Sequence, residues 1–459
     1  MPIRRPVASR LLIVTLVFHG LSVLAVEAQT ATQTTGAQSQ AGSTPAATAG
    51  QAPSAPQPAA GAAGQPAPPA GTNLQALSLI NALTYAQQRS FVSQQYDARV
   101  TGAAARLTGA GRLINPVLSI GGHFGQNAAG TDEDYILSQS FELGDKRRQR
   151  VLAASAERDA ASLDRQAAQN DLVYNVRSAY YEAQRADAAR QLAQNALDNA
   201  RKFAQAAELQ FTAGDIPRSQ VTRSRIEQNR AEQTLTIADT ERANRFATLR
   251  SLIHLPDSAT FDLADTLSFS PVTYTLADLQ AFALAHRPDL QSAQKLRASR
   301  EALLHSARVQ SQPDLFIEAR HANIDPAQGG DTLRFGLLFP LLDFGRNRAD
   351  AASAKAAVTE QEAVIAESRR TALLDVETAY RNLQQARQTV ESFRGGRLDS
   401  SRELLDQAQI GYSRGANTFL ELLDAQQVYR NEQTDYTRAL ADYNIALAAL
   451  QRAVGGQLP

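Results

Sequence analysis

Residues that commonly carry chemistry are sparse in this chain, and their spacing builds no recognisable catalytic or metal site. The sequence has no cysteine, which excludes a thiol nucleophile, a zinc–thiolate site, a disulfide and a lipid-modified cysteine. None of the six histidines stands at a metal-ligand spacing from another. The Gly-Gly-Asp string at 329–331 reads as a hairpin turn, and no phosphate-cradling motif is present. We therefore expect no enzymatic activity, no cofactor and no bound metal.

Two carboxylates near the C-terminus form the most suggestive polar pair. Glu421 and Asp424 are three residues apart, so a helix through them presents both on one face. Concentrated negative charge of this kind can attract cations. An ordinary solvated helix face is the plainer interpretation, and the residues alone leave both open.

The composition indicates which elements must position such residues. The 459-residue chain carries 46 basic and 46 acidic side chains, so its formal charge is zero and it offers no polycation for nucleic acid. Aromatic residues make up only 6% of the chain, whereas alanine and glutamine are frequent. Large compact cores are normally built from bulkier side chains. The composition therefore favours long helices over globular domains.

The N-terminus predicts export. Arg4, Arg5 and Arg10 precede an apolar run over 11–25, and small residues before position 29 indicate cleavage after Ala28. The run is shorter than the roughly 20 residues that span a bilayer. Residues 29–73 contain no charged residue and seven of the 18 prolines, which predicts a disordered linker.

The rest of the chain contains an internal duplication. We expect a first repeat at 74–256, a linker at 257–275 and a second repeat at 276–456. Four landmarks recur in the same order at offsets of 197 to 201 residues: Pro116 with Pro313, Gly144 with Gly345, Tyr180 with Tyr380, and Gly214 with Gly415.

Each repeat predicts the same series of elements. A helix (74–112 and 276–310, with a break near Pro288) precedes two strands (113–125 and 135–143; 314–322 and 332–342). A very long helix follows, at 145–213 and 346–413, and Gly395-Gly396 should weaken or bend the second one. Return helices are expected at 217–254 and 417–453, and alanine-rich seams predict that the long helices pack as coiled coils.

The strands of the second repeat alternate in polarity. Leu333, Phe335, Leu337, Phe339 and Leu341 share one face, whereas Glu318, Arg320 and Arg334 lie on the other. The charged face favours water and the apolar face accepts lipid, although a half-buried soluble sheet would alternate in the same way. Membrane barrels start at about eight strands, so four strands per chain would require several chains.

The whole pattern resembles the TolC family of trimeric outer-membrane channels. The resemblance covers about 74–456 and is most specific in "GANTFLELLDAQQVYRNEQTDYTRALADYNIALAALQRAVG" (415–455), "RPDL" (287–290) and "DFGRNR" (343–348). It implies a mainly α fold in which a homotrimer forms a twelve-stranded outer-membrane β-barrel continued by a periplasmic α-helical barrel. It also implies a passive exit duct of a tripartite efflux or secretion system. The partners would be a periplasmic adaptor protein, an inner-membrane pump and outer-membrane lipid.

The resemblance also assigns roles to individual residues. It implies that the two turns at the far ends of the long helices contact the adaptor, through Gly214, Asp215, Ile216, Pro217, Gly415, Ala416 and Thr418. Glu421 and Asp424 would form acidic rings at a closed aperture, and Glu318, Arg320 and Arg334 would line the barrel lumen. Tyr412 matches a tyrosine that holds the aperture shut, but Gln220 and Asn417 stand where the family has an acidic and a basic partner. We therefore expect a weakened lock, or one rebuilt with Arg218, Arg223 or Arg414.

Two other classes of protein remain as alternatives. An exported coiled-coil scaffold without a pore would explain the long helices but not two matched pairs of alternating strands. A periplasmic adaptor would need one helical hairpin between small β domains, and the duplication argues against it. The transported substrate and the class of pump cannot be read from the sequence.

Overall fold

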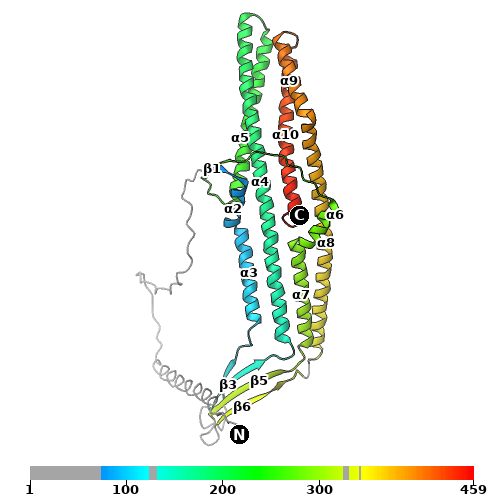
Figure 1. Cartoon of the computed structure of the whole chain (residues 1–459). Coiled ribbons are helices and arrows are strands. Elements are labelled where there is room, and N and C mark those ends of the chain that lie inside the picture. The colour runs from blue at the N-terminus through cyan, green and yellow to red at the C-terminus, as the bar shows by residue number, and fades with distance from the viewer. Residues whose placement is uncertain (1–73, 124–131, 324–329, 341–342, 459) are drawn as a thin grey trace, which may run out of the picture. The chain divides into compact units, whose positions relative to one another are not determined.

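The computed structural model describes residues 74–123, 132–323, 330–340 and 343–458, all of which belong to one unit, Pro68–Pro459. The predicted signal peptide and linker, Leu341 and most of the two loops between paired strands lie outside the described residues. Each repeat places its strands at one end of long helices and a helix–helix turn at the other end (Figure 1).

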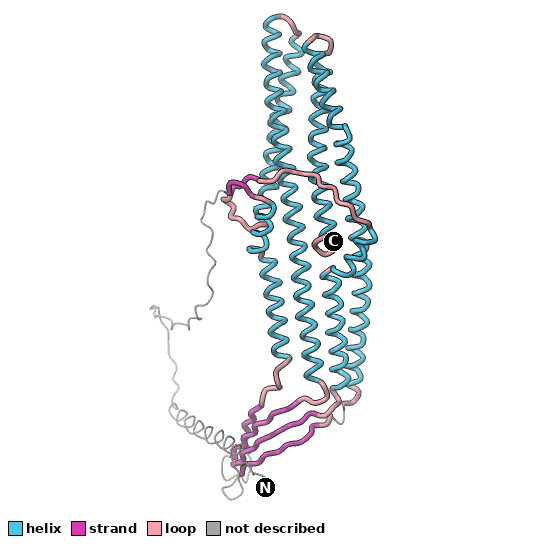
Figure 2. The backbone as a smooth tube through the Cα atoms, viewed as in Figure 1, coloured by secondary structure: helices cyan, strands magenta, loops and turns pink. Residues whose placement is uncertain are grey.

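The first repeat contains α2 (Leu79–Arg89), α3 (Phe91–Ala110), α4 (Lys146–Ala213) and α5 (Arg218–Leu252). The second contains α6 (Leu276–His286), α7 (Pro288–Val309), α8 (Arg346–Ser392), η1 (Phe393–Arg397), α9 (Leu398–Ser413) and α10 (Phe419–Ala453). Helix α4 is 68 residues long, which corresponds to about 100 Å. It contacts α3, α5, α7 and α10, so one rod joins the two repeats along their length (Figure 2). Among the helices of the described residues, none is both long and apolar enough to cross a bilayer.

The single helix expected over 74–112 is corrected to a strand and two helices. Strand β1 (Leu74–Leu77) pairs in parallel with β4 (Phe261–Leu263), which lies inside the expected linker 257–275. Helices α2 and α3 are separated by Ser90, whose backbone is extended. The Ser90 side chain caps the start of α3 by accepting a hydrogen bond from Ser93 N. Arg287 separates α6 from α7 with nearly the same backbone angles. The two repeats therefore share this bend, although only the second has a proline.

The glycine pair at 395–396 interrupts the second long helix. Residues Phe393–Arg397 form a short π-helical turn, in which Gly396 has a φ of +115° that L side chains rarely adopt. Arg397 then donates from Nη2 to Oε1 of Glu432 on α10 at 2.9 Å. The bend is thus fixed by a polar contact, whereas α4 passes the matching level without interruption.

The four longer strands form one antiparallel sheet in the order β2-β3-β5-β6. Strands β2 (Val117–His123) and β3 (Asp132–Phe141) come from the first repeat, and β5 (Asp314–Asn323) and β6 (Gly330–Leu338) from the second. The outer strands β2 and β6 each pair on one side only within the described chain. Because all pairs are antiparallel, β2 and β6 run in opposite directions.

Buried tyrosines hold the irregular segment after β4 across the helices. The Tyr180 hydroxyl lies 2.9 Å from the Leu77 carbonyl oxygen and 2.9 Å from the Asp265 carboxylate, which also accepts a hydrogen bond from Leu79 N. Burial, followed by the Asp265 hydrogen bond, raises the pKa of Tyr180 well above its ordinary value, so the hydroxyl stays protonated. In the second repeat, Tyr443 donates to the Ser270 carbonyl at 2.6 Å.

Candidate functional site

The first tip is the turn at 214–217, which joins α4 to α5. Gly214 ends α4 with a φ of +85°, and its N–H donates to the Phe211 carbonyl at 3.0 Å. The next N–H, of Asp215, donates to the Gln210 carbonyl at 2.9 Å, which completes a glycine-terminated helix end. The Asp215 side chain is exposed and Ile216 is half-buried. Pro217 precedes the first helical residue of α5 and provides no side-chain cap.

The second tip is the turn at 414–418, which joins α9 to α10. Gly415 has a φ of +72°, as at the first tip, but the start of the return helix differs. The Thr418 hydroxyl accepts from Glu421 N, and the Glu421 carboxylate accepts from Thr418 N at 2.6 Å. This capping box fixes Glu421 at the first turn of α10. Glu421 therefore has a structural task besides the proposed acidic ring.

Glu421 and Asp424 are both exposed on α10, whereas Leu422 and Ala425 on the neighbouring face are buried. Asp424 makes no ion pair with any described residue of the chain. Both carboxylates are thus displayed to solvent at the same end of the helix hairpin. Such a surface can concentrate cations when it is placed beside other copies.

The residues expected to lock the aperture are not joined within the described chain. The Tyr412 ring packs at 5.8 Å from the Phe419 ring, but its hydroxyl bonds to neither Gln220 nor Asn417. Asn417 instead lies against Gly411, where an added Cβ would overlap the Asn417 side chain. Arg218, Arg223 and Arg414 are exposed and form no ion pair with the described residues.

An aromatic side chain contacts the second helical hairpin below the tips. Phe203 of α4 packs against a small cluster on the second hairpin, formed by Leu405, Ala408, Tyr412, Leu422 and Ala425. Phe203 therefore joins α4 of the first hairpin to α9 and α10 of the second.

The sheet has one charged and one mainly apolar face. The Glu318 carboxylate lies directly opposite Arg334 and pairs with it at 3.2 Å, and Arg320 is two residues further along the same face of β5. The other face is continuous across all four strands and carries Leu118, Ile120, Leu137, Ile317, Leu333, Phe335 and Leu337. Phe335 is 80% exposed, so nothing in the described chain covers this face.

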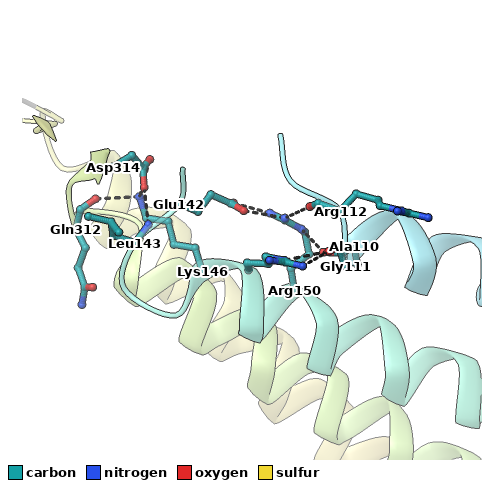
Figure 3. Close-up of polar contacts among 10 residues, drawn as sticks. Ala110, Gly111, Arg112, Glu142, Leu143, Lys146, Arg150, Gln312 and Asp314 are labelled. Atoms are coloured by element: carbon teal, nitrogen blue, oxygen red, sulfur yellow. Dashed lines mark hydrogen bonds and ion pairs between the residues drawn. The ribbon is translucent and has the colours of Figure 1, made fainter. Parts of the chain in front are cut away.

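A buried cation joins the sheet to the long helices (Figure 3). Lys146, at the start of α4, has a side chain only 5% exposed. Its ammonium donates to both carboxylate oxygens of Asp314, at 2.9 and 3.0 Å, and to the Gln312 carbonyl at 2.9 Å. Three acceptors satisfy the three donors of the ammonium. Because Asp314 begins β5, this contact ties the first repeat to the second.

Two arginines close the same junction from the side of α3. Arg150 forms a two-pronged pair with Glu142, at 2.5 and 2.7 Å, and its Nε donates to the Ala110 carbonyl at 3.2 Å. Arg147 donates to the Gly111 carbonyl. The last carbonyls of α3 therefore receive cationic donors, which is the favourable arrangement at a helix C-terminus.

Residues 82–253 and 281–456 match a family model described as outer membrane efflux protein. The chain belongs to the outer membrane efflux protein family. This efflux protein is 27% identical over 439 residues to the pyoverdine export outer membrane protein OpmQ of Pseudomonas putida, covering 85% of this chain and 92% of OpmQ. It is 24% identical over 315 residues to the cobalt-zinc-cadmium resistance protein CzcC of Cupriavidus metallidurans, covering 69% of this chain and 75% of CzcC.

Solved structures show that this efflux protein has the fold of an outer-membrane channel subunit. The outer membrane protein VceC of Vibrio cholerae superposes with a TM-score of 0.69 at 20% identity, over 82% of this chain and 96% of VceC. The Campylobacter jejuni CmeC outer membrane channel gives a TM-score of 0.70 at 16% identity, over 82% of this chain and 85% of CmeC.

These comparisons confirm the expected family, fold class and location. The protein is an outer-membrane efflux channel, not an enzyme, and the alternative of a scaffold without a pore is not supported. Channels of this kind in tripartite systems work with adaptor proteins and inner-membrane pumps. The sequence did not anticipate the Lys146–Asp314 and Arg150–Glu142 pairs, which join positions that the linear pattern does not bring together.

Proposed function

We propose that three copies of this chain form one passive exit duct. The observation that supports this most directly is a four-stranded sheet with two uncovered edges and two unlike faces. Edges β2 and β6 run in opposite directions, so β6 of one copy can pair antiparallel with β2 of the next, and three copies close a twelve-stranded barrel. The apolar face then meets lipid, and Glu318, Arg320 and Arg334 line the lumen.

At the opposite end, the two tips contact the periplasmic adaptor. The polypeptide there is exposed at Asp215 and at Ala416, and neither tip is covered by another element of the described chain. Glu421 and Asp424 of three copies form acidic rings at the aperture. The relatives CzcC and OpmQ are named for cobalt-zinc-cadmium resistance and for pyoverdine export, which agrees with a duct whose pump selects the substrate.

The absence of native cysteine allows a direct test of assembly and docking. Asp215→Cys and Ala416→Cys, each carrying a thiol-linked photo-crosslinker, should form adducts with the periplasmic adaptor in intact cells, and native mass spectrometry should show a particle of three chains. Leu374→Cys serves as the control, because Leu374 is exposed on α8 far from either tip. Equal adducts from Leu374 and the tips, or a particle of one chain, would contradict the proposal.

Tyr412 offers a separate test of the aperture. The Tyr412→Phe chain keeps the ring that packs on Phe419 and loses only the hydroxyl, which has no partner among the described residues of one chain. We therefore expect unchanged thermal stability and a higher single-channel conductance or open probability, because only a bond between copies is lost. If closure is unchanged, Tyr412 has no part in the lock.

A further inference from the structure

Phe344 is displayed to solvent by a backbone that is held in an unusual conformation. It lies between β6 and α8, has a φ of +48° and is 95% exposed. A positive φ is uncommon for a bulky residue and persists where the surroundings impose it. Here Asp343 accepts hydrogen bonds from Gly345 N and Asn347 N, both at 3.1 Å, and these bonds lower the pKa of Asp343. The turn is thus fixed locally, and the ring is not used within the described chain.

The first repeat shows what this junction contacts when a neighbouring strand is present. The matching turn at 143–146 docks against the segment before β5: Leu143 N donates to Asp314, and Lys146 donates to Gln312 and Asp314. Gly144 lies so close to Gln312 that an added Cβ would overlap its side chain. A strand-to-helix turn therefore packs on the segment that leads into the next strand of the sheet.

The second junction has no such neighbour within the described chain, because β6 is an edge strand. The segment left uncovered is the one before β2, the other edge. By the repeat offset it matches 310–314, and it exposes Leu113 (51%), Ile114 (44%) and Val117 (55%). Both junctions lie at the end of the sheet that meets the helices (Figure 1).

The two junctions share a backbone conformation but differ in residue types. Two consecutive residues with positive φ precede each long helix, Gly144 and Asp145 before α4 and Phe344 and Gly345 before α8. Phe344 therefore stands at the place of Gly144, and the segment at the start of β2 has Val117 where the first junction has Asp314. The acceptor of the buried ion pair is thus replaced by an aliphatic side chain, and the glycine by an exposed aromatic ring. Burying an aromatic ring against three aliphatic side chains removes apolar surface of both from water.

We propose that Phe344 of one copy packs into the Leu113–Ile114–Val117 surface of the next copy, as the counterpart of the contact between the turn at 143–146 and the start of β5. This inference rests on the proposed side-by-side assembly. It adds a contact between neighbouring copies at the end of the sheet that meets the helices. The occupant is a second copy, because the strand directions at the two free edges bring these segments together.

The test uses paired cysteines in the cysteine-free chain. Phe344→Cys with Ile114→Cys should give a disulfide-linked ladder that reaches three chains on a denaturing gel, and Phe344→Cys with Leu374→Cys should give none. In a second variant, Phe344→Gly, glycine accepts the positive φ, so the helical content should persist while the temperature at which the oligomer dissociates falls.

The outcomes separate this contact from the assembly itself. A wild-type particle of one chain overturns the proposed function. A particle of three chains with no 114–344 disulfide, or a Phe344→Gly oligomer as heat-resistant as the wild type, overturns the contact and leaves the assembly standing.

Discussion

Converting Glu421 to glutamine and Asp424 to asparagine in the same chain is expected to weaken block of the channel by multivalent cations. Three copies would lose six negative charges at the aperture. We expect the half-blocking concentration of a trivalent cation, measured in planar bilayers, to rise roughly tenfold. This is the low end of the increase in local counter-ion concentration that a cleft lined by charges of one sign produces. Glutamine at position 421 can still accept from Thr418 N, so the capping box survives.

Thr418→Val is the matched control for this effect. It removes the hydroxyl that caps α10 but leaves both carboxylates, so it should cost about 1 kcal/mol of stability and keep the cation block. The acidic-ring assignment is wrong if the double amide variant blocks at the wild-type concentration, or if Thr418→Val loses block to the same extent.

The second large effect is expected at the buried cation that joins the sheet to α4. Lys146→Met leaves the Asp314 carboxylate without its cationic partner, because the donor that remains to it among the described residues is Leu143 N. Breaking a buried pair in this way costs about 3 kcal/mol. The expected result is a clear fall in the urea midpoint of the detergent-solubilised protein, followed by far-ultraviolet circular dichroism.

Two further variants serve as controls for that measurement. Arg148→Met breaks the exposed Arg148–Asp145 pair at 3.5 Å and should cost less than about 1 kcal/mol. Adding Asp314→Leu to Lys146→Met removes the unpaired charge and should recover much of the loss. A Lys146→Met midpoint equal to that of Arg148→Met would show that burial of the pair contributes nothing.

Features of the fold were predictable from the sequence where a single residue has a strong conformational preference. Gly214 and Gly415 follow the ends of α4 and α9, and both have the positive φ that such helix ends favour. Gly396 interrupts the second long helix, as its lack of a side chain suggested. The alternation in β6 also marked the apolar face, which the register extends to the first repeat through Leu137, opposite Ala319.

Other features were missed for identifiable physical reasons. The bend at Ser90 has no proline, and its only signal is a serine that can cap the following helix. Strands β1 and β4 are four and three residues long, too short for a periodic pattern. The Thr418-x-x-Glu421 capping box was readable locally, and it gives Glu421 a structural task in addition to its proposed role.

Contacts between distant positions could not be read from one sequence. Lys146 and Asp314 are 168 residues apart, and the sequence around either residue does not indicate its partner. Their pairing depends on the turn at Gly144 and on the order of strands in the sheet, which emerge only in the folded chain. The partners proposed for Tyr412, Asp424 and Phe344 could not be read in this way either, because they belong to other molecules.

The reversal potential of the purified wild-type channel across a potassium chloride gradient tests the central claim most directly. Three chains that enclose one duct narrowed by Glu421 and Asp424 should give discrete channels with a cation-selective reversal potential, and the double amide variant should shift that potential toward zero. Absence of channels, or the same potential in both proteins, would contradict a duct whose aperture is lined by these carboxylates.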